Sequence, residues 1–201
     1  LVKIMIGAII LAAGNSSRFG SNKLLYPLNG KLMYHYVLEN LYRLLQEKQL
    51  DYLILVTQYD RIEQEIQSNY PEVMVVRNDV PNLGISHSIF LGLETLKQNL
   101  PEAEACLFAV SDQPYLTYDS VAGLLRTWKN TEKGIAACAH EDVIGNPVVF
   151  SKKYFDELKN LSGDKGGKRI LMNHMEDAIL YPVPARELED IDVKSVLKKT
   201  R

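Results

Sequence analysis

The sequence predicts an α/β protein: a single three-layer domain over residues 1–201, in which a mostly parallel sheet lies between helices in a Rossmann-like arrangement. Two observations lead to this prediction. Apolar runs of strand length recur along the chain, and several segments between them carry apolar residues at three- and four-residue steps, as amphipathic helices do. The 201 residues, of which 46% are hydrophobic, are also enough for one sizeable core without metal or disulfide support.

The first half of the chain alternates strands and helices. Strands are expected at residues 5–13, 52–57, 73–76 and 105–110, and helices at 32–45, 60–70 and from 86 onward. Asp60 and Glu63 have the spacing of a capping box, and Ser86 is expected to cap the third helix. This order predicts parallel strands joined by right-handed crossovers, with ligands bound beyond the carboxyl ends of the strands.

The second half continues with shorter elements. Thr117 is expected to cap a helix that buries Trp128, and Ser151 to cap another helix that runs to residue 161. Further strands are expected at 134–139, 145–150 and 179–183, with a helix at 170–175. The acidic cluster at 187–193 is typical of a solvated face.

The composition limits which kinds of binding partner and metal site are expected. A net charge of −2 gives no reason to expect nucleic acid or a membrane surface as partner, and the apolar run near residue 5 is too short to span a bilayer. Cys106 and Cys138 lie far apart in apolar segments, so we expect two buried, reduced thiols in a cytoplasmic protein. The four histidines do not cluster in the way that a zinc site requires.

The stretch at residues 9–23 carries the strongest chemical signal. An apolar strand opens at Gly14 into a loop of small residues that contains Arg18 and ends at Lys23. Such a loop lets backbone N–H groups approach a phosphate chain, while the two cations neutralise its oxygens. The spacing of a Walker loop and the dinucleotide fingerprint G-x-G-x-x-G are both absent from this stretch.

The pattern here, L-A-A-G-x-S-x-R-x-G-x-x-K, resembles the signature loop of the nucleotidyltransferases that make sugar nucleotides and cofactors. With Ala13 before Gly14 it is most similar to the molybdenum cofactor cytidylyltransferases, a MobA-like NTP transferase group; guanylyl relatives usually carry Ala-Gly-Gly. The resemblance implies a nucleotidyltransferase fold. It also implies that this loop binds the nucleotide through residues Leu11, Ala12, Ala13, Gly14, Arg18 and Lys23.

A second segment, residues 78–88, reads Asn-Asp-Val-Pro-Asn-Leu-Gly-Ile-Ser-His-Ser and leads into a helix. A helix N-terminus with open hydroxyls can bind a phosphate or a base edge. In the similar family the G-x-S-x-S pattern contacts the base, which implies that Asn82, Gly84 and Ser88 bind the nucleotide.

A third segment, Ser-Asp-Gln-Pro at residues 111–114, follows a buried strand. An Asp at a strand's carboxyl end can hold Mg²⁺ over phosphates, although Asp also favours turns on local grounds. The resemblance of D-Q-P to the family's metal motif favours Asp112 as a ligand, and a D-I-D-T motif implies Asp192 as the second one. This chain departs from that motif, because Val193 stands where Thr is usual; Asp190 stays open as the alternative.

The residues that bind the acceptor are predicted from less specific motifs. Gly-Asn-Pro at residues 145–147 resembles a family segment that lines the acceptor, which implies a role for Asn146 and Pro147, although a plain turn explains it nearly as well. Residues 163–169 are glycine-rich and cationic, which suits a phosphate-bearing acceptor. The related Gly-Asp-x-Gly-Ala-Arg implies Gly166 and Lys168 or Arg169, because Lys168 stands where the family has Arg.

The resemblance implies Mg²⁺-dependent transfer of CMP from CTP to molybdopterin or its molybdenum-loaded form, with release of pyrophosphate. Arg18, Lys23 and Asp112 are the expected catalytic residues, and the mechanism is positioning plus charge neutralisation. A molybdenum hydroxylase apoenzyme is a further candidate partner. Three alternatives stay open: a sugar or polyol phosphate as acceptor, GTP as donor, or a non-catalytic protein that binds the nucleotide or cofactor for a molybdenum hydroxylase.

Overall fold

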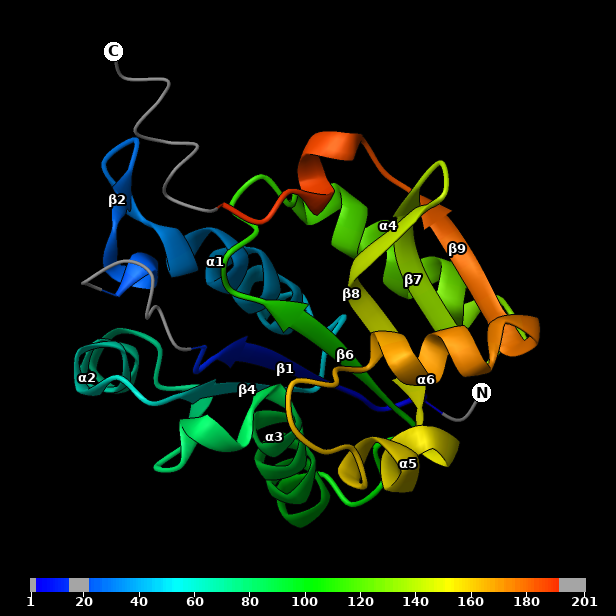
Figure 1. The fold of residues 1–201 in the computed structure, drawn as a ribbon, viewed down its shortest axis with the longest axis horizontal. Coiled ribbons are helices and arrows are strands. Elements are labelled where there is room, and N and C mark those ends of the chain that lie inside the picture. Colours follow the sequence, from blue (N-terminus) through cyan, green and yellow to red (C-terminus); the bar gives the residue numbers. More distant parts are fainter. Residues whose placement is uncertain (1–2, 15–21, 192–201) are drawn as a thin grey trace.

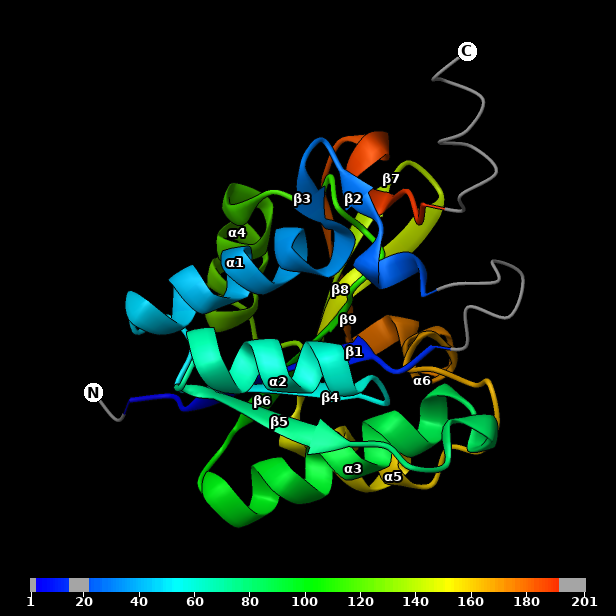
Figure 2. The same cartoon turned by 90° about the vertical axis from the view of Figure 1, so that its left-hand side faces the viewer.

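One seven-stranded sheet runs through the molecule in the order β5–β4–β1–β6–β8–β7–β9. Figure 1 labels the strands from β4 to β9, and Figure 2 labels β5. The computed structural model describes residues 3–14 and 22–191. Neighbouring strands are parallel except β8, which is antiparallel to both β6 and β7. The strands are β1 (Ile6–Ala12), β4 (Tyr52–Thr57), β5 (Val73–Arg77), β6 (Ala105–Val110), β7 (Ile135–His140), β8 (Val143–Ser151) and β9 (Ala178–Pro182). The predicted α/β fold with a mostly parallel sheet is confirmed.

Helices cover both faces of the sheet, which makes three layers (Figure 2). On one face lie α1 (Met33–Gln46), α2 (Asp60–Asn69) and α4 (Tyr118–Lys129). On the other face lie α3 (Ile85–Asn99), α5 (Phe155–Lys159) and α6 (Lys168–Asn173). Trp128 of α4 is buried in the first of these cores, as expected.

The apolar run of β1 is explained by its central position. Ile10 points into the core under α1, whereas Ile9 points into the core under α3, and both are fully buried. Each such isoleucine contributes about 1.5–3 kcal/mol relative to an exposed one. A strand buried on both faces therefore reads as continuous hydrophobic sequence rather than as an alternating pattern.

The winding of the chain reverses between β1 and β6. From β1 the chain moves outward to β4 and β5 through α1 and α2, then returns through α3 on the opposite face to β6, on the other side of β1. At such a reversal the loops that leave the two central strands diverge to opposite faces of the sheet, and a crevice opens between them. The loops after β1 and β6 are those that carry the opening motif and D-Q-P.

The helix starts bear out one predicted cap. Thr117 precedes α4, and its hydroxyl accepts a hydrogen bond of 3.2 Å from the Ser120 amide. Ser86 does not cap α3, because that helix begins one residue earlier, after Gly84, and the Ser86 hydroxyl donates to the Leu83 carbonyl instead. The cap predicted at Ser151 is also wrong, since its side chain makes no capping hydrogen bond.

The capping box predicted at Asp60 is wrong as well. Tyr59 precedes α2, and no side chain caps the helix. Asp60 and Glu63 both form ion pairs with Arg77 at the end of β5, a partner 14 or more residues away along the chain. Ion pairs with Arg77 therefore replace the capping hydrogen bonds that the spacing of these two carboxylates suggested.

Several short elements complete the chain. Asn29 and Gly30 form the expected turn, both with positive φ, at 51° and 80°. The turn joins β2 (Pro27–Leu28) to β3 (Lys31–Leu32) in a small separate hairpin. The 3-10 helices are η1 (Lys23–Leu25), η2 (Pro81–Leu83), η3 (Lys152–Tyr154), η4 (Met175–Asp177) and η5 (Ala185–Leu188).

Two buried thiols and one buried carboxylate lie in the core. Cys106 and Cys138 are free and buried, as expected. Burial and then the charge of Glu187 raise the pKa of the Cys138 thiol to about 12. Glu187 itself is only 6% exposed and accepts hydrogen bonds from the Thr117 amide and hydroxyl, so this member of the acidic cluster is not on a solvated face. Among the described helices, none has the length and apolar character needed to span a bilayer.

Candidate active site

A pocket of about 360 Å³ opens where β1 and β6 end. Its walls come from the loop after β1, from η1, from the start of α3, from the turn after β6, and from the loop before α6. The lining residues are Leu11, Ala13, Gly14, Lys23, Leu24, Pro81, Gly84, Ile85, Ser88, Val110, Ser111, Asp112 and Asp164. Segments far apart in the sequence thus meet at the edge of the sheet where ligands of this fold class bind.

Lys23 and Asp112 face each other in this pocket. Lys23 Nζ lies 2.6 Å from Asp112 Oδ2, and the two side chains are 24% and 21% exposed. Lys23 opens η1, and the Asn22 side chain caps this short helix by accepting a 3.0 Å hydrogen bond from the Leu24 amide. The two predicted charged residues are therefore brought together, as a mostly buried ion pair.

The motif loop leaves β1 with its carbonyl groups bonded to neighbouring segments. The Leu11 carbonyl accepts hydrogen bonds from the Ser111 amide and hydroxyl. The next three carbonyls, of residues 12, 13 and 14, accept hydrogen bonds from the side chains of Thr57, Gln58 and Tyr59 in turn. Sequence reasoning did not single out these three side chains, because nothing local links residues 57–59 to a loop 45 positions earlier.

The start of α3 supplies a further wall. Gly84 has a φ of +85°, and Ser88 is buried, with its hydroxyl accepting a 3.0 Å hydrogen bond from the Asn78 amide group. Both line the pocket, whereas the third residue expected to bind the nucleotide, Asn82, is exposed and is not among the lining residues. The structure therefore places two of these three residues at the pocket.

The glycine-rich loop packs directly on this helix start. The Gly163 carbonyl accepts a 3.2 Å hydrogen bond from the Ser86 amide. A Cβ atom on Gly84 would lie 2.4 Å from the Gly163 carbonyl carbon and oxygen, so only glycine permits this approach. The contact places Asp164 in the pocket lining, a position that sequence reasoning missed because the segment was interpreted only as an acceptor site.

Asn146 and Pro147 lie in β8 at an irregularity of the sheet. Cys138 pairs with Gly145 and Ala137 pairs with Val148, so β8 has two extra residues between these partners. Since β6 and β8 are antiparallel and pair at Phe108 and Val148, the preceding residues of β8 run alongside the end of β6 that leads to Asp112. The bulge therefore sets these two residues beside the pocket without making them part of its lining.

The remaining acceptor-side residues lie farther out. Lys168 begins α6, and its Nζ donates a 3.0 Å hydrogen bond to the Ile144 carbonyl of β8. Arg169 is exposed, and Gly166 is partly buried. Lys168 thus connects α6 to the strand that carries Asn146, and these residues form an outer zone next to the pocket rather than part of its wall.

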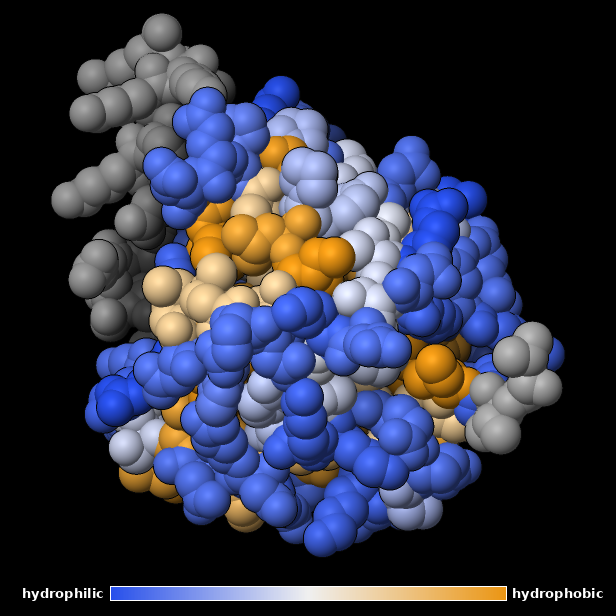
Figure 3. Space-filling view, turned by 90° about the vertical axis from the view of Figure 1, so that its right-hand side faces the viewer, coloured by the Kyte–Doolittle hydropathy of each residue, from blue (hydrophilic) through white to orange (hydrophobic). Residues whose placement is uncertain are grey.

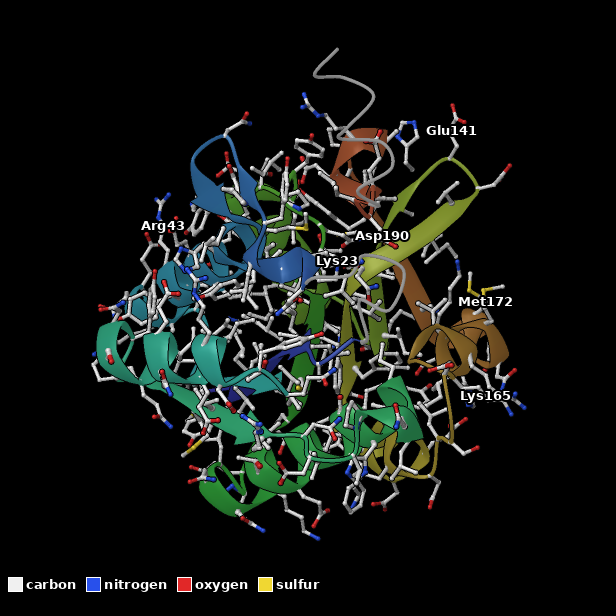
Figure 4. All side chains as sticks on the ribbon, turned by 60° about the vertical axis from the view of Figure 1, so that its left-hand side comes forward. Lys23, Arg43, Glu141, Lys165, Met172 and Asp190 are labelled. Atoms are coloured by element: carbon white, nitrogen blue, oxygen red, sulfur yellow. The ribbon has the colours of Figure 1, made fainter. Side chains whose placement is uncertain are left out.

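The acidic segment returns to the D-Q-P turn. The Ile191 amide donates a 3.0 Å hydrogen bond to the Asp112 carbonyl, and Gln113 Nε2 donates to Asp190 Oδ1 at 2.9 Å. In the projection of Figure 4, the labels of Lys23 and Asp190 lie toward the middle of the molecule, and those of Lys165 and Met172 lie toward its outer side. The predictions for Arg18 and Asp192 concern residues that lie outside the described part of the chain.

A patch of apolar side chains lies on the face that carries β9 and α6 (Figure 3). The large hydrophobic residues of β8, α6 and β9 with the greatest exposure are Val143, Met172 and Leu180, at 59%, 53% and 38%. None of them lines the pocket.

The lining of the pocket suits a polyanionic ligand. Lys23 supplies a positive charge, and small or glycine residues leave the backbone of Ala13, Gly14 and Gly84 open to a ligand. Asp112 supplies a carboxylate at a strand's carboxyl end. The described residues contain no group of three or more acidic, histidine or cysteine side chains that could enclose a metal by themselves.

Comparison with known proteins identifies the family to which this chain is similar. The family model of the MobA-like NTP transferase domain matches residues 8–178. The purine catabolism protein PucB of Bacillus subtilis is 27% identical over 194 residues, which cover 92% of this chain and 90% of that protein. The molybdenum cofactor guanylyltransferase of Yersinia pestis is 30% identical over 147 residues, 71% of this chain and 66% of that protein. The crystal structure of Rv0371c from Mycobacterium tuberculosis superposes with a TM-score of 0.77 at 22% identity, covering 98% of this chain and 97% of that one, which bears on the fold alone.

Proposed function

From the premise that this chain belongs to the MobA-like NTP transferase family and is a nucleotidyltransferase, we propose that it transfers a nucleotidyl group to a phosphorylated acceptor with the help of Mg²⁺. The preferred acceptor is molybdopterin or its molybdenum-loaded form. The observation that carries the proposal is the pairing of Lys23 with Asp112 at the mouth of the motif loop. Family membership favours an enzyme over the alternative of a non-catalytic binding protein.

The described residues fit a magnesium ion. Mg²⁺ keeps several waters and takes only one or two protein carboxylates together with phosphate oxygens. Asp112 offers such a carboxylate inside the pocket, and Asp192, which follows the Ile191 that bonds to Asp112, is proposed as the second. Asp190 is the less suitable candidate, because one of its oxygens already accepts a hydrogen bond from Gln113. Bound there, Mg²⁺ would neutralise phosphate charge.

The chemistry needs no activated side-chain nucleophile. An oxygen of the acceptor phosphate attacks the α-phosphorus of the nucleoside triphosphate, and the bond from the α-phosphorus to the β-phosphate oxygen breaks, so that pyrophosphate leaves with that electron pair. Lys23 and Arg18 are proposed to stabilise the charge that moves onto the pyrophosphate. Fixed cations aimed at developing charge in a partly dry site are the main source of catalysis in such a reaction.

The identity of the base is the least constrained part of the proposal. Ala13 lines the pocket and stands where guanylyl relatives usually carry glycine, which favours CTP. The Yersinia relative is named a guanylyltransferase, which favours GTP. We therefore propose CTP and GTP as the two donors to compare. CTP is preferred because Ala13, which lines the pocket, stands where guanylyl relatives carry glycine.

The acceptor would lie on the side of β8 and α6. Asn146, Pro147, Gly166, Lys168 and Arg169 are proposed to bind it, because they form the outer zone beside Asp112. The exposed Arg169 and the Lys168 ammonium suit a phosphate group there. A sugar or polyol phosphate would satisfy the same charges, so the acceptor has to be identified by experiment.

The test is pyrophosphate release in Mg²⁺ with CTP, GTP, UTP or ATP, each with and without molybdopterin. The proposal expects release only when molybdopterin is present together with one of the two proposed donors. Asp112→Asn should abolish most of this release, whereas the matched change Asp156→Asn, at a side chain that is 92% exposed, should not.

Two results would change the proposal. Release with a sugar or polyol phosphate, and none with molybdopterin, would replace the acceptor and keep the reaction. If Asp112→Asn releases pyrophosphate at the wild-type rate, Asp112 is not a metal ligand in this reaction.

A further inference from the structure

We infer that Thr57 and Gln58 are positioning residues that fix the direction of the Ala13 and Gly14 N–H groups toward the bound nucleotide, and that Tyr59 holds Gly14 in place beside them. This inference rests on the proposed function, since it assumes that a nucleoside triphosphate occupies the pocket. It concerns the turn between β4 and α2, which the proposed function does not use.

The geometry is a one-to-one match between two short segments. Thr57 Oγ1 donates to the Ala12 carbonyl at 3.2 Å, and Gln58 Nε2 donates to the Ala13 carbonyl at 2.9 Å. Tyr59 Oη then donates to the Gly14 carbonyl at 2.7 Å. We call this set of three hydrogen bonds the loop clamp.

Because the peptide group is planar, the loop clamp also fixes the direction of N–H groups in the loop. In a trans peptide the carbonyl of one residue and the N–H of the next point in opposite directions. Holding the Ala12 carbonyl toward Thr57 therefore turns the Ala13 N–H away from β4, and holding the Ala13 carbonyl toward Gln58 does the same for the Gly14 N–H. Among the described residues, neither N–H donates to a backbone carbonyl outside the strand ladders.

The pocket adjoins both residues that carry these N–H groups. Ala13 and Gly14 line it together with Lys23, whereas the three residues of the loop clamp do not. Two adjacent N–H donors beside a cation make a site for phosphate oxygens or for an acceptor atom of the base.

The loop clamp is itself held firmly in place. Thr57 is fully buried, and its Oγ1 also accepts a 3.1 Å hydrogen bond from the Tyr59 amide. The Tyr59 ring packs against the core under α1 and α2, so its hydroxyl is presented by a fixed aromatic ring. Because this support already orders the loop, the loop loses less conformational entropy when the ligand binds.

The test uses Gln58→Met and Tyr59→Phe, which remove one donor each with little change in shape. Calorimetry with CTP and GTP should show affinity for the donor nucleotide weakened roughly 3- to 10-fold by each variant, the loss of one hydrogen bond's worth of positioning. KM for the nucleotide should rise by a similar factor. Matched controls are Gln67→Met and Tyr42→Phe, whose side chains donate to Glu63 and Glu72 away from the pocket and which should leave affinity unchanged.

Amide hydrogen exchange provides a readout that does not depend on turnover. In the wild-type protein, the nucleotide should slow exchange of the Ala13 and Gly14 amides. Gln58→Met should lose much of the protection at the Gly14 amide, and both variants should keep wild-type circular dichroism. Wild-type affinity and protection in both variants would overturn the inference and leave the proposed function intact. A wild-type protein that binds none of the four nucleotides would overturn the proposed function, and this inference with it.

Discussion

Lys23 Nζ lies 2.6 Å from Asp112 Oδ2, so the cation of the motif loop and the carboxylate of the D-Q-P turn neutralise each other in the free protein. For Asp112 to hold a metal and Lys23 to hold a phosphate, this pair must separate. Under the proposed function, a triphosphate would attract Lys23, and the departure of the Lys23 ammonium would free the carboxylate for Mg²⁺. We therefore expect metal and nucleotide to bind cooperatively.

Lys23→Ala should separate these two roles. Pyrophosphate release should fall by about 10²–10³-fold, the usual cost of removing one group that stabilises developing charge. Binding of Mg²⁺ to the nucleotide-free protein should become tighter, because the competing ammonium is gone. Calorimetric titration with Mg²⁺ measures the second effect. Lys129→Ala is the control, since Lys129 is exposed and bonds only weakly to the Gln49 carbonyl at 3.4 Å; unchanged Mg²⁺ affinity in Lys23→Ala would contradict competition.

Ala13→Gly should shift the preference between donors toward GTP. The Ala13 side chain lines the pocket, and its removal enlarges the space beside the motif loop. The ratio of kcat/KM for GTP to that for CTP should rise by about 10-fold or less, as expected for one methyl group in a pocket. Ala103→Gly is the matched control, because Ala103 is 5% exposed, close to the 6% of Ala13, and does not line the pocket. An equal ratio in the wild type and in Ala13→Gly would show that this residue does not select the base.

Gly84→Ala should displace the loop that carries Asp164. The added Cβ would lie 2.4 Å from the Gly163 carbonyl carbon and oxygen, and the positive φ of +85° adds strain. We expect a loss of about 2–5 kcal/mol in the free energy of unfolding, from the clash and the backbone strain together. Gly30→Ala isolates the strain, because Gly30 has a φ of +80° and open space around its Cβ position. Urea denaturation of both variants measures the difference, and equal losses would mean that the contact with Gly163 is not tight.

Acid stability should depend on Asp177. Burial acts to raise the pKa of this carboxyl, but hydrogen bonds from Lys153, Tyr154 and the Gly134 amide outweigh it and lower the pKa to about 2 from an ordinary 3.8. Because the folded-state pKa is the lower one, the stabilisation is fully present above about pH 4 and is lost as the pH falls toward 2.

The measurement is urea denaturation of the wild type and Asp177→Asn at several pH values. The difference in unfolding free energy between them should be constant near neutral pH and shrink as the pH falls from about 4 to about 2. Lys153→Met should raise the Asp177 pKa in an NMR titration, since it removes an ion pair of 2.6 Å. A difference that stays constant down to pH 2 would rule out the lowered pKa.

The sequence was most informative where chemistry is local. The runs at 52–57 and 105–110 match β4 and β6, because strands buried on both faces need continuous apolar residues. The opening motif and D-Q-P led to the Lys23–Asp112 pair because both follow such strands. The antiparallel direction of β8 could not be derived in this way, since an apolar run does not specify its neighbours.

Long-range partners account for the errors. Asp60 and Glu63 have the spacing of a capping box, but Arg77 of a neighbouring strand takes both carboxylates. Glu187 lies in an acidic run and is nevertheless buried against Thr117. Only the folded chain brings such groups together, and the loop clamp was missed for the same reason.

The antiparallel direction of β8 also determines where insertions can alter the site during evolution. Because β8 is antiparallel to β6, the turn at Glu141 and Asp142 that precedes it projects at the edge where β6 ends, and it is exposed to solvent (Figure 4). Residues inserted at this tip would extend the outer zone beside the pocket and leave the register of the parallel strands untouched. Descendants of one ancestral enzyme could in this way accommodate larger or smaller acceptors by lengthening or shortening a single hairpin, while the nucleotide chemistry was inherited unaltered.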